Sequence, residues 1–357
     1  MKHRSDATVE TQMTVLRTAG LSIALAMGGK LLLRNSPHNC LTTILIHKFT
    51  FDGEPLGNAR ERLKYQCEWL KKNYSPMTLA AATDGLSGGR LPNMPLLITI
   101  DDAHIDTLDV FDIFRTFELP IAIFVCVGWC ANASPPEDDT RLAGLVSDLE
   151  WYSGPERELV LPCGRLVIQR DKRRRRETIT SLIKSRKKWQ PFFDEIVREL
   201  RSYRPPRRRN FCNWQELIEL QKSGVEIGCH SVSHMNLAEA DETRLAFEIG
   251  EAKRILTTKF GRCEAFAYPF GIPGSFSTST SETLKRASFR FAFLTRSDFA
   301  TGRENPHELP RISLPDRPIS LAEFRARVGG GGVVIATLRN YFRNNVKKTA
   351  DNKQPVI

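Results

Sequence analysis

The sequence predicts an α/β fold built on a parallel sheet, either closed into a barrel or doubly wound. Two observations support this prediction. Short apolar runs alternate along the chain with segments of helical periodicity, an order typical of repeated β/α units. No internal repeat of fixed period is visible, which argues against a solenoid or a propeller. The 357 residues are 41% hydrophobic and 26% charged, an ordinary globular composition that argues against a largely disordered chain.

Strands are expected where short apolar runs are bounded by turn residues, at 41–46, 96–100, 121–127, 225–228, 265–267 and 289–294. Helices are expected at 59–73, 107–117 and 213–223, where apolar residues recur at helical spacing. Gly224 is placed as the stop of the third helix. A fourth helix should begin after Asp241, an N-cap residue, because Leu245, Ile249, Ala252 and Leu256 follow at helical spacing.

Composition divides the chain into three regions. We expect a helical segment over 1–40, the β/α region over 41–316 and a basic tail over 317–357. Residues 131–210 carry prolines and charge runs and are expected to be an insertion between two β/α units. The apolar run 18–29 is shorter than the roughly 20 residues of a membrane span. It is expected to be a helix on the domain or on a membrane surface, with a cleaved export signal as the alternative.

The net charge of +11 is concentrated in one segment. Residues 165–209 contain 17 Lys or Arg and 5 Asp or Glu, so the rest of the chain is nearly neutral. The runs 172–176 and 207–209 could contact an anionic membrane or nucleic acid. A solvated insertion is the simpler interpretation, and nucleic-acid binding is not expected.

The eight cysteines are scattered, with no C-x-x-C pair, and several lie in apolar runs. Buried, reduced thiols explain this distribution and favour a reducing compartment. We therefore expect a cytoplasmic protein with a possible membrane association, and export by an N-terminal signal is the alternative.

Adjacent carboxylates follow an apolar strand at Asp101 and Asp102. The carboxyl edge of the sheet is where β/α barrels carry their chemistry, and successive strand residues point in opposite directions. The two acids should therefore act differently, one on a metal and the other on a water molecule. An N-cap pair for the helix at 107–117 is the alternative.

Two histidines, His230 and His234, follow the strand at 225–228. Imidazoles four residues apart lie on one side of a helical turn and can share a metal ion. A structural role is the alternative for the pair alone. Together with a strand-end Asp, two His leave coordination positions open for water and substrate, as a catalytic site requires.

A third motif, Phe266-Ala267-Tyr268-Pro269-Phe270-Gly271, follows another strand. Pro and Gly around aromatic residues predict a rigid turn that can present a backbone N–H and an apolar wall.

In this order the motifs resemble the polysaccharide deacetylase (NodB-homology) family. Thr99-Ile100-Asp101-Asp102-Ala103 resembles its T-F-D-D-G motif, 230–234 its H-[ST]-x-x-H motif, and 266–271 the F-A-Y-P-[FY]-G variant of its third motif. The segments 44–47 and 309–312 resemble its opening strand and a late L-P-R-I segment. The resemblance implies a distorted (β/α) barrel with fewer than eight strands and a closed parallel sheet.

The resemblance also implies a hydrolase that removes N-acetyl groups from an oligo- or polysaccharide. Asp102, His230 and His234 would bind a divalent ion, with Zn²⁺ favoured, and Asp101 would be the general base. A backbone N–H near Tyr268 would stabilise the oxyanion. Tyr268, Pro269, Arg311 and His47 are expected to contact substrate.

Several positions depart from the family pattern. Ala103 replaces a Gly, which matters if that position needs a positive φ. Ala267 stands near the place of an Arg that orients the base, and Arg311 is a possible substitute. The L-x-H motif that supplies the general acid is missing, so His307 is its candidate, while His104 is expected to be a loop residue. These departures leave two alternatives open: a carbohydrate-binding protein without turnover, or a membrane or nucleic-acid binder that acts through the basic insertion.

Overall fold

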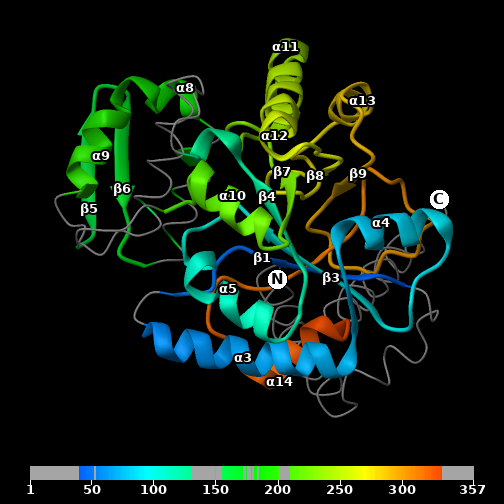
Figure 1. Cartoon of the computed structure of the whole chain (residues 1–357). Helices are drawn as coiled ribbons and strands as arrows, with labels where there is room; N and C mark the ends of the chain where they lie inside the picture. Colours follow the sequence, from blue (N-terminus) through cyan, green and yellow to red (C-terminus); the bar gives the residue numbers. More distant parts are fainter. Residues whose placement is uncertain are drawn as a thin grey trace, which may run out of the picture.

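The computed structural model describes residues 40–51, 54–130, 155–171, 185–201 and 210–331, together with residues 149, 174, 178, 181 and 182. A curled parallel sheet forms the centre of the molecule, and most helices surround it (Figure 1). The expected apolar segment 18–29 and the end of the expected basic tail lie outside the described residues.

Seven strands follow one another around the sheet in the order β10-β1-β3-β4-β7-β8-β9. They are β1 Thr42–Ile46, β3 Pro95–Asp101, β4 Ile121–Val125, β7 Glu226–Cys229, β8 Ala265–Ala267, β9 Phe291–Phe293 and β10 Ile312–Ser313. A short eighth strand, β2 Ser75–Met77, pairs with the first residues of β3. The segment from Leu309 to β10 closes the barrel, because Leu309 pairs with Phe293 on one side and Ile312 with Ile44 on the other. The distorted (β/α) barrel is thus confirmed.

The expected helices are present, with ends shifted by a few residues. They are α3 Leu56–Asn73, α5 Asp106–Thr116, α10 Trp214–Lys222, and a continuous run of α11 Glu242–Leu245, the π-helix η4 Ala246–Glu251 and α12 Ala252–Phe260. Asn213 and Glu216 form a capping box on α10, which satisfies backbone donors at the start of the helix. The sequence did not predict α4 Leu79–Gly88, α13 Thr278–Arg286 or α14 Leu321–Val328.

Side chains alternate along the strands and divide the core into two layers. In β3, Ile98 and Ile100 belong to the outer core beneath the helices. Leu97 lies in the inner cluster, where it is joined by Phe124 of β4 and Phe293 of β9. This period of two follows from strand geometry and places the side chain of every second residue inside the barrel.

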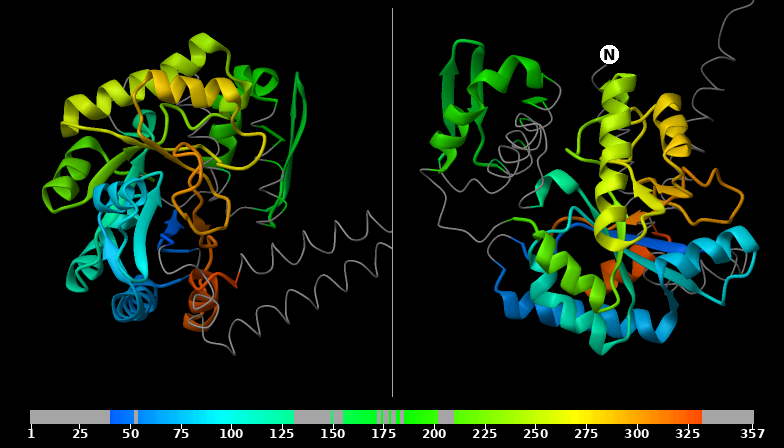
Figure 2. Two further views of the ribbon diagram at one scale, coloured as in Figure 1. Left: turned by 90° about the vertical axis from the view of Figure 1, so that its right-hand side faces the viewer. Right: turned by 45° about the horizontal axis from the view of Figure 1, so that its top comes forward.

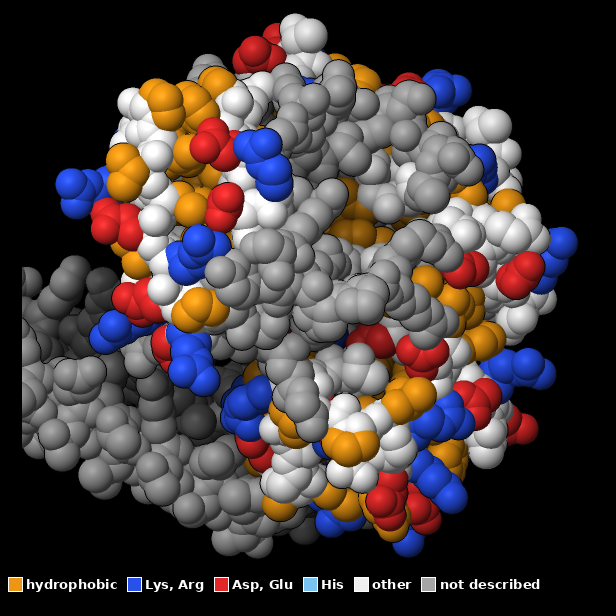
Figure 3. Space-filling model, turned by 90° about the vertical axis from the view of Figure 1, so that its left-hand side faces the viewer, with side chains coloured by type: hydrophobic (Ala, Val, Ile, Leu, Met, Phe, Trp, Pro, Cys, Tyr) orange, Lys and Arg blue, Asp and Glu red, His pale blue; other side chains and the backbone are white. Residues whose placement is uncertain are grey.

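Residues 155–201 form a small unit within the segment expected to be an insertion. It contains the hairpin of β5 Arg157–Leu161 and β6 Gly164–Ile168, the helices α8 Arg186–Trp189 and α9 Phe193–Arg201, and its own apolar cluster around Ile196. The unit stands beside the barrel in Figures 1 and 2. On the face shown in Figure 3, blue and red side chains are interspersed, so the described part of that face has no continuous basic patch. The runs 172–176, apart from Arg174, and 207–209 lie outside the described residues.

Helix α14 begins beyond residue 316, the expected end of the barrel region. Its Phe324 and Val328 are buried in the same outer core as β1 and β3. Folded structure therefore extends into the segment that we expected to be a tail. Within the described residues, no helix is long and apolar enough to cross a membrane.

Candidate functional site

Asp101 and Asp102 lie at the carboxyl end of β3 and diverge. Asp101 ends the strand, and Asp102 follows in the left-handed region at φ 71°, with its N–H donated to the Phe124 carbonyl at 3.0 Å. Ala103 also has a positive φ, 53°. The position is therefore one that favours glycine, and an alanine there carries backbone strain.

The second motif is a bend after β7, so the expected helical turn is wrong. Ser231 and His234 both have left-handed backbone, with φ values of 67° and 57°. The His234 N–H donates to Ser231 Oγ at 3.0 Å. The bend pairs with the segment after β4, where Val127 and Gly128 donate to the carbonyls of Ser231 and Val232. This pairing explains why β4 ends at Val125, two residues before the expected end.

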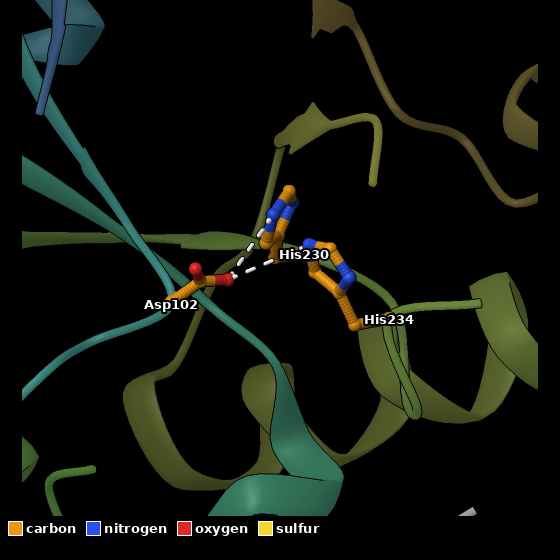
Figure 4. A group of neighbouring side chains, drawn as sticks. All are labelled: Asp102, His230 and His234. Carbon is orange, nitrogen blue, oxygen red and sulfur yellow. Dashed lines mark ion pairs between the residues drawn. The ribbon is translucent and has the colours of Figure 1, made fainter. Parts of the chain in front are cut away.

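The bend brings His230 and His234 to Asp102 (Figure 4). One ligand atom from each residue lies within 4.8 Å of the others. Asp102 Oδ1 is 3.5 Å from His230 Nε2 and 3.6 Å from His234 Nε2. It is buried and has no hydrogen-bond partner among the described residues. His230 Nδ1 lies 2.7 Å from the Ala267 carbonyl oxygen, so Nδ1–H donates there and Nε2 keeps its lone pair for a cation.

This donor set fits a divalent metal ion. A buried carboxylate oxygen without a donor is costly unless a cation neutralises it, and burial also raises the pKa of Asp102. Burial lowers the pKa of His230 to about 4, so its imidazole is neutral at physiological pH, as a metal ligand must be. Two His and one Asp are the ligands of an open, catalytic type of centre.

Arg311 lies behind Asp101 in the barrel interior. Its guanidinium donates to both carboxylate oxygens of Asp101 at 2.8 and 2.7 Å, to the Leu294 carbonyl at 3.0 Å and to Thr99 Oγ at 3.3 Å. Burial alone would disfavour the ionised form, but Arg311 lowers the pKa of Asp101 to about 2. Arg311 is itself 0% exposed. It therefore holds Asp101 ionised and in place, and the expected contact between Arg311 and substrate is wrong.

His47 follows β1 at the same edge of the barrel. Its side chain is 28% exposed, and its Nδ1 lies 3.5 Å from Oδ1 of Asp316. Burial opposes protonation, yet the carboxylate of Asp316, with those of Asp102 and Asp101, raises the pKa of His47 to about 9. The structure thus brings His47 and Asp316 to the site, although no motif in the sequence singled out Asp316.

In the third motif, the side chains of Tyr268 and Pro269 are buried. The Tyr268 side chain is 0% exposed and packs against Phe266 and Phe276, and Pro269 is also buried. The Tyr268 N–H donates to the Phe293 carbonyl at 3.1 Å. Both side chains are therefore buried away from substrate, and the expected backbone N–H near Tyr268 stays a prediction. Besides the Ala267 carbonyl, Phe270 reaches the metal ligands, with its ring centroid 4.9 Å from that of His234.

His307 does not reach the site. It is 6% exposed, and its Nε2 lies 2.8 Å from the carbonyl oxygen of Phe289, which precedes β9. That carbonyl marks the amino end of the strand, whereas the metal ligands lie at the carboxyl ends. The expected role of His307 as the general acid is therefore wrong.

Aromatic rings that the sequence did not indicate form one wall of the site. Trp129 stacks on His234 at 5.0 Å and on Phe211 at 4.4 Å, and Phe211 contacts His104 at 4.8 Å between ring centroids. His104 Nε2 is 3.9 Å from Asp102 Oδ2 and belongs to this wall. Trp129 lies in the short 3₁₀ turn η1 Val127–Trp129 after β4, and that position at a strand end was the available signal.

The polysaccharide deacetylase family model matches residues 168–292, about a third of the chain. The matched part contains both histidines and the third motif. No curated protein matches the sequence.

Solved structures show the fold. IcaB from Ammonifex degensii superposes with a TM-score of 0.52 at 15% identity, over 82% of this chain and 97% of that chain. The deacetylase PplD of Streptococcus pyogenes, solved with acetate, gives 0.51 at 15% identity, over 77% of this chain and 92% of that chain. A polysaccharide deacetylase from Bacillus cereus gives 0.52 at 13% identity, over 81% and 69%. The family match thus covers about a third of the chain, and the solved structures show that the chain shares the fold of these deacetylases.

Proposed function

We propose that the chain is a metal-dependent hydrolase that removes N-acetyl groups from a saccharide or polysaccharide precursor. One observation carries this proposal: Asp102, His230 and His234 converge beside a carboxylate, Asp101, which Arg311 keeps ionised. The fold shared with solved deacetylases and the family match support the choice of substrate class. The F-A-Y-P-F-G sequence at 266–271 further suggests the variant of the family with that third motif.

A divalent ion, for which we favour Zn²⁺, would activate a water molecule and polarise the acetamide carbonyl. Asp101 is suited to accept the proton of that water. Its carboxylate lies 3.9 Å from His230 Nε2, at the edge of the metal ligands. It is ionised, and Arg311 fixes its orientation through two hydrogen bonds, so no reorganisation is needed before proton transfer.

His47 is our candidate for the general acid that protonates the leaving amine. It directly follows β1, which pairs with β3 so that Ile46 is opposite Ile100, one residue before Asp101. Of the described histidines outside the metal-ligand set, His47 is the one with a substantially exposed side chain. The Asp316 carboxylate beside Nδ1 would orient the ring and favour its protonated form.

The backbone N–H of Phe270 is our candidate oxyanion donor. The Tyr268 N–H is already donated within the barrel, and Pro269 has no N–H. Phe270 has φ 63° and lies against His234, so its amide is the next one along the motif that can serve the metal site. This N–H would stabilise the negative charge that develops on the carbonyl oxygen.

A carbohydrate-binding protein without turnover is less well supported. That alternative rested on a missing Arg and a missing acid. Arg311 reaches Asp101 from β10's side of the barrel, and His47 with Asp316 provides an acid at the carboxyl edge. We therefore infer that Arg311 and His47 would supply both functions from positions that differ from the family pattern.

The test is release of acetate from N-acetylglucosamine oligomers by metal-loaded protein. We expect turnover in the wild type and its loss in Asp101→Asn. The matched control is Asp84→Asn, because Asp84 is an exposed carboxylate paired with Arg290 on the surface. Binding of the oligomers without any acetate release, whatever divalent metal is supplied, would favour the alternative.

We further propose that the protein works in a reducing compartment, the cytoplasm, and that its basic insertion contacts anionic membrane. All eight cysteines are free, and six of them are buried, which fits a reducing environment. Binding to anionic vesicles should weaken steeply with salt and be lost when the basic residues of 172–176 are replaced by Ser. Binding that is insensitive to salt would contradict the membrane proposal.

A further inference from the structure

Glu248 is a fully buried carboxylate outside the site described above. It lies in the π-helix η4 and is 0% exposed. Its Oε2 accepts the backbone N–H groups of Val232 at 3.0 Å and of Ser233 at 2.9 Å, and its Oε1 accepts the Ser233 hydroxyl at 2.6 Å. All three hydrogen bonds therefore fall on the two central residues of the bend that carries His230 and His234.

The bend needs such support because its backbone is strained. Ser231 and His234 both hold left-handed φ values, and residues other than Gly keep that conformation only where the surroundings enforce it. The carbonyl side of the bend is held by Val127 N, Gly128 N and Cys126 Sγ, the last at 3.0 Å from the Val232 oxygen. Glu248 holds the N–H side, so the bend is fixed between the segment after β4 and η4.

Two features adapt the helix to this task. A π-turn places one extra residue in the turn, and such turns are frequent at functional sites. Arg244, one turn earlier, lies 2.7 Å from Glu248 Oε1 and 3.3 Å from Ser233 Oγ. This pairing compensates the cost of burying an ionised carboxylate.

We propose that Glu248 is a positioning residue that sets the relative placement of His230 and His234, so that both Nε2 atoms face Asp102 Oδ1 at 3.5 and 3.6 Å. Glu248 touches neither the ligands nor the reacting atoms. It acts through the backbone of Val232 and Ser233, which join the two histidines. The proposal rests on metal binding by Asp102, His230 and His234.

The competing explanation is that Glu248 only stabilises the fold, and Asp106 provides the matched control. Asp106 is also a buried carboxylate, and it accepts the N–H groups of Phe49 and Thr50 and the Thr50 hydroxyl at 2.8, 2.9 and 3.1 Å. It makes the same kind of clamp on a loop that carries no metal ligand. Asp106→Asn should therefore reproduce a loss of stability without a loss of metal affinity.

The experiment compares Glu248→Gln with Asp106→Asn in the full chain. Zn²⁺ affinity is measured by competition with a chelator, and the Co²⁺-substituted protein is examined by its visible d–d spectrum. Gln keeps the shape of Glu but loses one acceptor, so we expect Zn²⁺ affinity to fall by about 10- to 100-fold and the Co²⁺ bands to shift. In Asp106→Asn both should match the wild type.

If Glu248→Gln does not fold, Ser233→Ala removes the 2.6 Å bond to Oε1 and the 3.3 Å bond from Arg244, keeps both backbone bonds to Glu248, and should still lower Zn²⁺ affinity, by a smaller factor. Unchanged Zn²⁺ affinity and an unchanged Co²⁺ spectrum in a folded Glu248 or Ser233 variant would overturn the positioning role. A wild-type protein that binds neither metal would instead contradict the proposed function itself.

Discussion

The substitution Arg311→Met should lower the free energy of unfolding by much more than the loss of a surface ion pair does. The change removes a guanidinium that is 0% exposed and leaves the carboxylate of Asp101 buried without its partner. Two charge-assisted hydrogen bonds to Asp101 are lost, each worth about 1.5–3 kcal/mol. Removing one member of a buried pair costs about 3–5 kcal/mol, so both estimates agree on a destabilisation of about 3–5 kcal/mol.

Urea unfolding of the metal-free protein measures this effect. Arg317→Met is the matched control, because Arg317 is 53% exposed and pairs with Glu323 on the surface. That variant should lose no more than about 1 kcal/mol. The double variant Asp101→Asn/Arg311→Met should recover part of the loss, since no unpaired charge remains. A loss for Arg311→Met as small as for Arg317→Met would refute the assignment of a buried, paired carboxylate at Asp101.

Three further predictions concern packing, catalysis and pH. A Cβ at Gly228 would clash with the ring of Phe124, so Gly228→Ala should cost about 1–3 kcal/mol in unfolding experiments. Gly57→Ala, with open space and a helical position, should cost nothing. His47→Gln should lower kcat by about 10²- to 10⁴-fold with little change in metal content, and an unchanged kcat would exclude it as the acid. In metal-free protein, the depressed pKa of Asp101, about 2 against 3.8, should contribute about 2 kcal/mol above pH 4 that is lost as the pH falls towards 2. The same acid-induced loss in Asp101→Asn would contradict that source.

The strand ends that carry Asp101, Asp102 and His230 could be predicted from sequence because each follows a short apolar run directly. Local pattern alone fixes which edge of a parallel sheet these residues share. The conformation of the bend after β7 could not be predicted in this way. A spacing of four residues suits a helical turn. This bend depends instead on hydrogen bonds to β4 and the segment after it, far away in the sequence, and to Glu248.

Arg311, His307 and Tyr268 show why side-chain roles were harder to assign. The sheet closes at 309–313 through contacts between segments that are distant in the sequence. This closure determines which residues of the segment face the barrel interior. That closure buries Arg311 against Asp101 and leaves His307 at the opposite edge. Tyr268 lies with Phe266 in the outer core beneath the helices, because strand alternation continues one residue beyond β8.

Glu248 did leave a signal in the sequence. It is three residues after Leu245 and four before Ala252, both of which the helical period places in the core, and both are buried. A charged residue on the apolar face of a helix needs a partner. The sequence therefore indicates a buried polar contact at Glu248, although it does not identify the partner.

The central claim is that Asp102, His230 and His234 hold a catalytic metal ion. Elemental analysis of purified protein, after dialysis against excess Zn²⁺ and then against metal-free buffer, tests it most directly. The account predicts one divalent ion per chain in the wild type and His307→Ala, and a loss of most of that metal in His230→Ala and His234→Ala. Full metal content in both of the last two variants would contradict it.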